Sequence, residues 1–235
     1  MLMFTARLAY AVPEYIQSEQ TAAGSVDESV ESTEHAFKLP EPAQVFSRLR
    51  EVFREGTLDL KLRNYYFYRR RDADPNVEAW AQGGGLTYAT PWWKNRLRLG
   101  STLYTSQKLY APADKDGSKL LEPGQKSFNV AGQAYVEARL YGDLSLRVYR
   151  QTFQFPYLNG NDSRMVPNTF ESVTLYDFSG EHLVYGLGQT WRMKKRDATN
   201  FISMTQAAGI DGPDRALSTA GARYTFSNGA NVGLV

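Results

Sequence analysis

The sequence predicts an all-β fold, an antiparallel transmembrane β-barrel, present here as a partial barrel of about eight to ten strands with a short N-terminal helix. Three observations support this prediction. Apolar and polar residues alternate with a period of two along most of the chain after residue 57. The connections between these segments alternate along the chain between tight turns and long loops. Aromatic residues make up 13% of the chain and gather near the predicted strand ends.

The bulk composition is compatible with this class. The chain has 235 residues, a formal net charge of +2 and no cysteine. So small a net charge does not indicate a general nucleic-acid binder, and the lack of cysteine excludes disulfides and thiolate chemistry. No run of about 18 apolar residues occurs, so no transmembrane helix is expected. The mean hydropathy of -0.47 still permits a membrane barrel, because only alternate residues of its strands face lipid.

The N-terminal part divides into two segments. Residues 1–43 are expected to be a leader. A secretory signal has an uninterrupted apolar core, but here Arg7 interrupts the apolar start, which indicates an incomplete signal. A polar, flexible stretch follows it. Residues 44–56 predict a short packing helix, since apolar residues recur there at helical spacing, at Val45, Leu49, Val52 and Phe53.

Residues 57–235 predict barrel strands with two unlike faces. The first strand alternates Leu58, Leu60 and Leu62 with Asp59, Lys61 and Arg63. Similar alternation recurs over residues 97–104, 130–141, 144–149 and 183–194. A last strand pair begins near Ser218 and turns at Asn228-Gly229, a dipeptide that favours a tight hairpin. The run Gly83-Gly84-Gly85 is expected to mark a bent strand.

The predicted connections differ in length from one end of the strands to the other. Tyr141-Gly142-Asp143 is a tight turn, whereas residues 111–127 and 155–168 are long loops. Short turns on one rim and long loops on the other are typical of outer-membrane barrels.

The two faces also differ in charge. If the leucine side meets lipid, the opposite side carries eight basic residues, namely Lys61, Arg63, Arg96, Arg98, Arg139, Arg147, Arg192 and Lys194. The acids on that side of these strands are Asp59 and Glu137. A dry core could not hold so many guanidinium groups without partners. This face is therefore expected to line a water-filled pore that attracts anions.

The alternation alone also fits a soluble or surface-exposed β-sandwich that binds carbohydrate through its aromatic residues. The aromatic positions favour the barrel, since Tyr65 to Tyr68 and Trp92-Trp93 lie at predicted strand ends, the level of barrel girdles. A third alternative, an enzyme built in an outer-membrane barrel, would need a nucleophile and base on one rim, and no such pair stands out.

Four segments, in the same order along the chain, resemble the OprD family of specific porins. They are Leu58 to Phe67 (LDLKLRNYYF), Trp80 to Gly83 (WAQG), Leu158 to Phe170 (LNGNDSRMVPNTF) and Arg196 to Asn200 (RDATN). The first resembles the first barrel strand of that family, and the third resembles its inward-folding third loop. The resemblance covers residues 57 to the end.

This resemblance implies a monomeric barrel of about 18 strands with a narrow eyelet and a ladder of basic residues that guides a carboxylate. The third loop would span about Pro156 to Thr169, with Tyr157, Asn161, Asp162 and Arg164 near the constriction. At two strands per roughly 40 to 50 residues, the chain is expected to be the N-terminal half of such a porin, a fragment.

The implied function is a passive channel in the bacterial outer membrane for small carboxylate-bearing solutes, such as amino acids and small organic acids. Its other partners would be outer-membrane lipid and lipopolysaccharide, with no nucleic acid.

No enzyme activity, cofactor or metal is expected, because His35 and His182, the only histidines, lack a second ligand at metal-binding spacing. The run Lys194-Lys195-Arg196 is interpreted as a solvated strand end in preference to a phosphate or lipopolysaccharide site.

Overall fold

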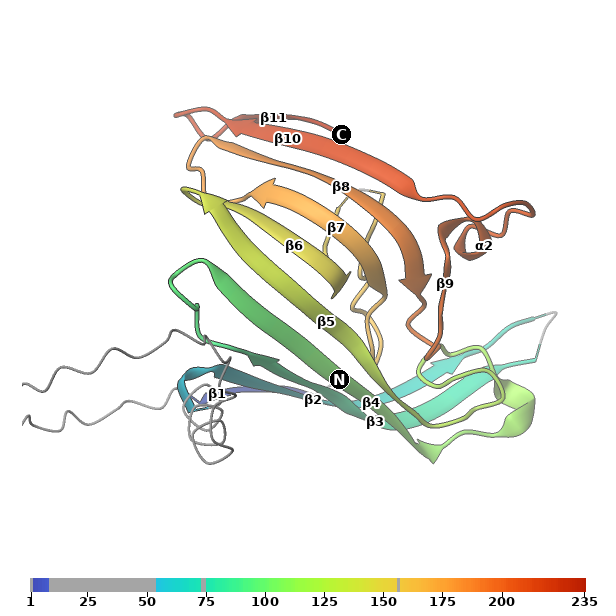
Figure 1. Ribbon diagram of the computed structural model, residues 1–235. Coiled ribbons are helices and arrows are strands. Elements are labelled where there is room, and N and C mark those ends of the chain that lie inside the picture. The colour runs from blue at the N-terminus through green and yellow to red at the C-terminus, as the bar shows by residue number, and fades with distance from the viewer. Residues whose placement is uncertain (1, 9–53, 73–74, 156) are drawn as a thin grey trace, which may run out of the picture. The chain divides into compact units, whose positions relative to one another are not determined.

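The computed structural model describes residues 2–8, 54–72, 75–155 and 157–235. The described strands form one antiparallel sheet of eleven strands in the order β1-β2-β3-β4-β5-β6-β7-β8-β10-β11, with β9 paired to β8 (Figure 1). Ten of these strands lie within residues 57–235, in agreement with the prediction. In this sheet β1 and β11 are each paired on one side only, so it is the open sheet of a partial barrel.

Each strand from β1 to β7 pairs with the next one along the chain, and β8 pairs with both β9 and β10. The strands are β1 (Leu2–Leu8), β2 (Thr57–Arg69), β3 (Val77–Ala89), β4 (Leu97–Tyr110), β5 (Phe128–Tyr141), β6 (Leu144–Gln151), β7 (Thr169–Asp177), β8 (Leu183–Lys194), β9 (Phe201–Ser203), β10 (Leu217–Thr225) and β11 (Asn231–Leu234). Two short helices, η1 (Ala113–Lys115) and α2 (Met204–Ala207), lie in connections. No helix in the described part of the chain has the length and hydropathy to cross a membrane.

The contacts divide the chain into two units, residues 1–8 with 56–235, and residues 9–55. Within the predicted leader, Leu2–Leu8 form β1, antiparallel to β2, with Phe4 opposite Leu62. The period-two pattern of apolar residues there matches the leucine row of β2. The remainder of the leader lies outside the described residues, as does the predicted helix 44–56, except that residues 54 and 55 are helical.

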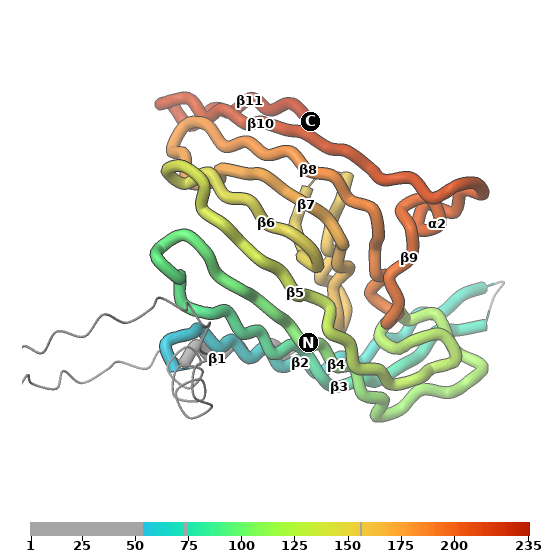
Figure 2. The backbone as a smooth tube through the Cα atoms, in the orientation of Figure 1, coloured from blue at the N-terminus to red at the C-terminus, as the bar shows by residue number. Residues whose placement is uncertain are grey.

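The connections keep the predicted alternation in length. Gly142, with φ 54°, closes the β5–β6 turn, and Gly229, with φ 83°, closes the predicted β10–β11 hairpin. At the other end lie the connections 70–76, 111–127, 152–168 and 195–216. Residues 152–168, between β6 and β7, fold back along the sheet (Figure 2) and reach β2 through Asp162.

The glycine run in β3 allows the backbones of β2, β3 and β4 to approach closely. A Cβ on Gly84 would lie 1.8 Å from the carbonyl oxygen of Lys61, and one on Gly83 would lie 2.2 Å from that of Thr105. Both glycines have positive φ angles, 138° and 153°, that other residues adopt rarely. The run is therefore a point of close contact between three strands, and the bend expected there stays a prediction.

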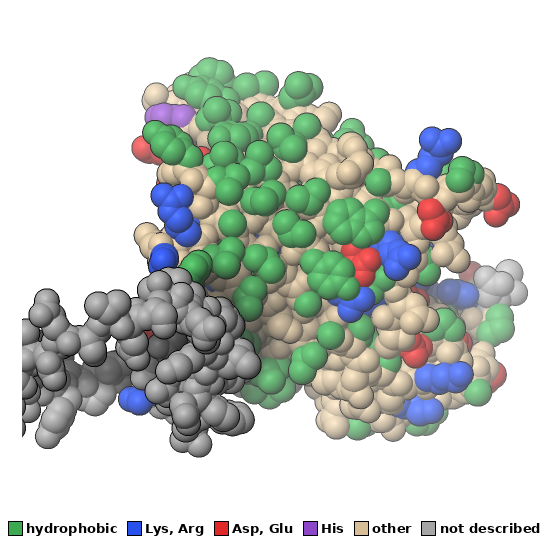
Figure 3. Space-filling model, in the orientation of Figure 1, with side chains coloured by type: hydrophobic (Ala, Val, Ile, Leu, Met, Phe, Trp, Pro, Cys, Tyr) green, Lys and Arg blue, Asp and Glu red, His purple; other side chains and the backbone are tan. Residues whose placement is uncertain are grey.

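The sheet has two faces, which the register defines because residues opposite each other share a face. We call the face of Leu58, Leu60 and Leu62 the outer face and the other the inner face. Outer-face side chains such as Leu62 and Leu103 are 51% and 56% exposed, whereas Glu137 on the inner face is 4% exposed. Figure 3 shows a surface in which hydrophobic side chains predominate over the upper strands.

This arrangement is the reverse of a soluble sheet, which buries its apolar face. The described strands form a single sheet, not the two stacked sheets of a sandwich. A small hydrophobic core lies on the inner face, between β3 and the two long loops 111–127 and 152–168. Its buried members are Ala79, Ala81, Leu120, Leu121, Phe128, Met165 and Val166. This core holds the loops against the inner face, as a barrel with an infolded loop requires.

Candidate functional site

The loop predicted to form the constriction is fastened to β2 by an ion-pair cluster. The Oδ2 atom of Asp162 lies 2.7 Å from Lys61 Nζ and 2.5 Å from Arg63 Nη2. Arg63 Nη1 also donates to the carbonyl oxygens of Arg164 and Met165. The Arg63 side chain is only 3% exposed. Lys61 and Arg63 thus lie on the predicted face, but they hold the loop and are not free ladder cations.

The carboxyl group of Asp162 is acidified by this cluster. Burial alone would raise its pKa, but the hydrogen bonds and charges of Arg63 and Lys61 outweigh burial and hold the pKa below its usual range. Asp162 is therefore charged at neutral pH. The loop attachment depends on that charge.

The other predicted loop residues divide into anchors and a free residue. The Arg164 side chain donates from Nε to the carbonyl oxygen of Ser118, at 3.0 Å, in the loop 111–127. Asn161, with φ 44°, accepts a bond from Arg196 Nη1 at 3.4 Å. Tyr157 is 74% exposed. The loop is thus tied to β2, to the neighbouring long loop and to the segment after β8.

A second cluster on the inner face is centred on Glu137 of β5. Its Oε2 atom lies 2.6 Å from Arg98 Nη2 and 3.0 Å from Arg147 Nη2, and its Oε1 atom accepts a hydrogen bond from the hydroxyl of Tyr176. Arg98, Glu137 and Arg147 lie directly opposite one another on β4, β5 and β6. Tyr176 of β7 lies diagonally from Arg147, opposite Ser145. Glu137 therefore orients two guanidinium groups and offsets part of their charge.

Trp92 extends this cluster toward the rim with the short turns. Its ring contacts two guanidinium groups, those of Arg98 and Arg139, at 4.6 Å and 3.9 Å from the ring centroid. Arg139 also donates to Asn95 Oδ1 at 2.8 Å. Arg96 lies in the turn itself, is exposed and donates to the carbonyl oxygen of Leu140 at 3.3 Å. Arg98, Arg139 and Arg147 thus share the inner face, with Arg96 at its edge.

The girdle prediction holds for only some of the aromatic residues. Tyr66 and Tyr68 are exposed on the outer face at 55% and 50%. Tyr65 and Phe67 alternate with them and pack instead on the inner hydrophobic core. Trp92 contacts arginines, as described above, and its neighbour Trp93 is 65% exposed. That these aromatic residues are neighbours in the sequence did not show which of them face outward and which face inward.

The orientation predicted for Arg192 is wrong. The register places it opposite Glu171, which lies opposite Arg150, and this row is on the outer face with Val148 and Val173. The cause is a register shift between Glu171 and Ser172, because one extra residue in β8 reverses the facing that simple alternation predicts.

Lys194 is also not part of an open wall. Its side chain is fully buried, and its Nζ donates to the carbonyl oxygens of Pro167 and Lys195 at 3.1 and 3.0 Å. It offers no surface to a solute. Lys194 instead holds the end of the loop 152–168 near the end of β8.

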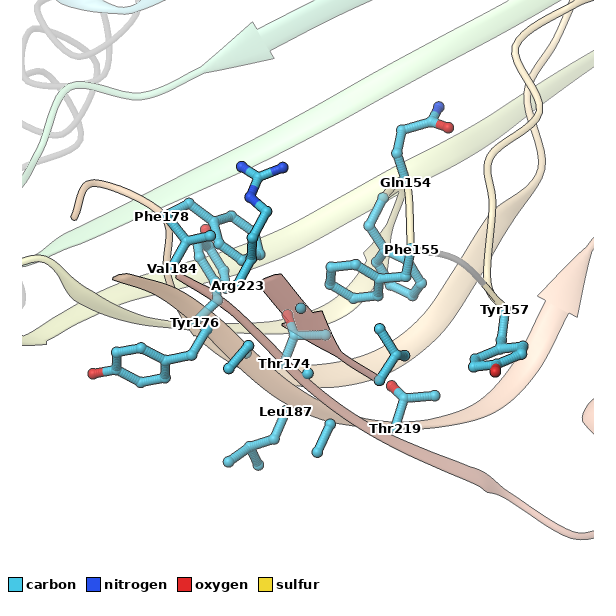
Figure 4. A pocket seen from close by; sticks show the side chains of 18 of the residues that line it. Gln154, Phe155, Tyr157, Thr174, Tyr176, Phe178, Val184, Leu187, Thr219 and Arg223 are labelled. Carbon is cyan, nitrogen blue, oxygen red and sulfur yellow. The ribbon is translucent and has the colours of Figure 1, made fainter. Parts of the chain in front are cut away.

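Sequence reasoning missed an aromatic hollow beside the loop. It has a volume of about 600 Å³, and Phe155 and Tyr157 from the loop face Thr174, Tyr176 and Arg223 across it (Figure 4). Five aromatic rings follow one another in contact, with neighbouring centroids 4.7 to 6.2 Å apart, namely Phe170, Phe153, Phe155, Phe178 and Tyr176. Neighbouring rings are stacked except Phe155 and Phe178, which meet edge to face. The spacing of Phe153 and Phe155 directly after β6 was the available signal.

Glycines create the open side of this hollow. Gly186 on β8 lies opposite Gly221 on β10, and both line it. Because neither has a side chain, the strands leave room next to the aromatic rings. Aromatic rings, glycines and the two cations Arg147 and Arg223 therefore all line the hollow.

The described residues contain no group of three or more His, Cys, Asp or Glu that could hold a metal ion. His182 lies in the turn before β8, with Nδ1 3.0 Å from the carbonyl oxygen of Thr225. It links that turn to β10. His35 lies outside the described residues.

Comparison with known proteins identifies the architecture. The model of a family described as outer membrane porin, OprD family, matches residues 51–235. OccK9 (OpdG) from Pseudomonas aeruginosa has a TM-score of 0.65 and 25% identity, over 77% of this chain and 50% of that chain. A BenF-like porin from Pseudomonas fluorescens Pf-5 has a TM-score of 0.63 and 23% identity, over 77% of this chain and 49% of that one.

OccAB1 from Acinetobacter baumannii has the same fold, with a TM-score of 0.63 and 20% identity, over 76% of this chain and 42% of that one. A search of the curated proteins gave no match. The chain spans half or less of the length of these solved structures. The open antiparallel sheet, its apolar outer face and the family match over most of the chain agree, and the chain belongs to the OprD family of outer membrane porins.

Proposed function

We propose that this chain forms part of the wall of an outer-membrane channel for passive, selective uptake of small carboxylate-bearing solutes, such as amino acids and small organic acids. No bond is made or broken, and no cofactor takes part. The observation that carries the proposal is the set of oriented guanidinium groups on the inner face, those of Arg98, Arg139 and Arg147. A guanidinium group can meet a carboxylate with two parallel hydrogen bonds.

The contacts of these arginines favour passage over tight binding. Glu137 already accepts bonds from Arg98 and Arg147, and the ring of Trp92 covers one side of Arg98 and Arg139. Each cation therefore retains only part of its attraction for a second anion. Conduction needs sites that are strong enough to recruit a solute and weak enough to release it.

The loop 152–168 supplies the other half of the selection. Its three fastenings hold it against the inner face, where it narrows the passage, and Asn161 and Asp162 are the acceptors that we propose to contact solute. The hollow lined by Phe155, Tyr157 and Arg223 would receive the apolar part of a solute. OpdK from P. aeruginosa, 20% identical, has a structure with vanillate, and we include ring-bearing acids of that kind among the proposed solutes.

Liposome swelling tests the proposal. The protein, isolated from outer membranes, is reconstituted and exposed to benzoate or to benzyl alcohol, which has a similar size and no charge. Arg139→Gln and Arg147→Gln each should slow benzoate entry about fivefold, the effect of losing ~1 kcal/mol of attraction in water. Benzyl alcohol entry should change little, and added salt should reduce the difference between the solutes.

The matched control is Arg192→Gln, which removes an arginine from the outer face. It should leave the entry of both solutes unchanged. Carboxylate selectivity that survives both inner-face substitutions, or that falls equally with Arg192→Gln, would contradict the proposed role of the inner face.

A further inference from the structure

Three charged residues form a row on the outer face, which the leucine row of β2 and the valines beside the charged row make largely apolar. Arg150, Glu171 and Arg192 lie opposite one another on β6, β7 and β8. Their nearest neighbours along the same face are Val148 on β6 and Val173 on β7, which are themselves opposite. A charged row on this face is unexpected in a barrel, because the face meets lipid.

The position of the row explains how it is tolerated. Arg150 is next to last in β6, Glu171 is third in β7, and Arg192 is third from the end of β8. All three lie at the end of the strands where the long connections begin. Charge on a lipid-facing strand costs much at the midplane and little near the interface. The row therefore lies at interface height, on the rim that faces outward in outer-membrane barrels.

The members of the row are not equally paired. Arg150 Nε lies 3.0 Å from Glu171 Oε1, and the Glu171 side chain is only 6% exposed. The guanidinium group of Arg150 also lies over the ring of Phe201, 4.2 Å from its centroid. Arg192 is exposed, and its side chain makes no hydrogen bond or ion pair with any described residue. One full positive charge with free donors thus remains at the interface.

We infer that this row is a binding site for the phosphorylated glycolipid of the outer leaflet, lipopolysaccharide. Arg192 donates to a phosphate oxygen of its lipid A part, and Arg150, held by Glu171 and Phe201, completes the pair of donors. The acyl chains lie along Val148, Val173 and the apolar rows below them. A phosphorylated glycolipid can contact both the arginines, through its phosphates, and the apolar rows beside them, through its acyl chains. Free phosphate can contact only the arginines.

Lipid retention provides the test. The protein, isolated from outer membranes in mild detergent, is analysed by native mass spectrometry for bound lipopolysaccharide, and then titrated with purified lipid A. Arg192→Gln and Arg150→Gln should weaken lipid A binding about tenfold each, the effect of losing one charged hydrogen bond. Arg139→Gln, on the inner face, is the matched control and should bind as the parent does.

Two further titrations identify the ligand and use only the unaltered protein. Lipid A from which both phosphates have been removed should bind at least tenfold more weakly, and inorganic phosphate should not displace lipid A at equal concentration. Equal binding of phosphorylated and dephosphorylated lipid A would overturn the inference, and so would efficient displacement by inorganic phosphate. Equal loss in Arg139→Gln would show a general loss of positive charge instead of this site, which also overturns it.

The inference rests on the family and its membrane, not on the proposed solutes. Arg192→Gln should lower lipid A binding without changing benzoate entry, and Arg139→Gln should do the opposite. The two proposals can therefore fail separately.

Discussion

Glu137 shows how one acid can set the properties of several cations. It accepts hydrogen bonds from Arg98, Arg147 and Tyr176, and its side chain is 5% exposed. The residue was recognised in the sequence only as one of two inward acids. Its partners are 10 to 39 positions away, so no local pattern indicates that a single carboxylate joins four strands.

Replacing Glu137 by Gln should raise anion selectivity and lower stability. The substitution keeps the shape of the side chain but removes the negative charge next to two guanidinium groups. The reversal potential in a potassium chloride gradient should shift toward anions, and the free energy of unfolding should fall by ~2 kcal/mol, the usual effect of losing a charged hydrogen bond.

Glu181→Gln provides the control for this variant. Glu181 is an exposed acid in the β7–β8 turn, so its removal changes the net charge equally without affecting the cluster. The same shift in reversal potential in both variants would contradict a specific role for Glu137.

At the level of elements, the strands were predictable and the loop contacts were not. Period-two alternation identified β2 and β8, because each has one apolar and one polar face. Alternation failed at Arg192, where the register shift beside Ser172 changes the facing. It also could not anticipate that Asp162 would meet Arg63, 99 residues away, although the resemblance to a porin loop indicated the segment concerned.

The fastening of the loop by Asp162 should depend on pH. Its carboxyl pKa is lower in the folded protein than in the unfolded chain. The stabilisation is therefore complete above the unfolded value, about 4, and is lost as the pH falls through the lower folded value. Amide hydrogen exchange of residues 157–168 should stay slow from about pH 7 to pH 5 and then rise, relative to intrinsic rates, below about pH 4.

Asp162→Asn tests the origin of this change. The variant should show an already loosened loop at neutral pH and no further step in acid, because the carboxyl group that takes up the proton has been removed. An acid step of the same size in the variant would assign the transition to another group.

On the scale of the whole sheet, the facing of the leucines determines where the protein can reside. Leu58 and Leu62 are both on the outer face of β2 and are 44% and 51% exposed. Leu58 lies beside the first residue of the strand, at the short-turn end, and Leu62 lies near its middle. If the outer face meets lipid, the two positions differ in depth but not in orientation.

Arginine substitution at these two positions distinguishes a membrane face from a protein interface. In lipid vesicles, Leu62→Arg should lower the free energy of unfolding by about 2–4 kcal/mol, because the charge would lie near the midplane. Leu58→Arg should lower it by only about 0–1 kcal/mol, because that position is near the interface. Urea titration of the vesicle-inserted protein, followed by heat-modifiable migration on gels, measures both. Similar losses at the two positions would indicate a face buried against protein, where depth along the strand has no such effect, and would contradict the lipid-facing assignment of the leucine row.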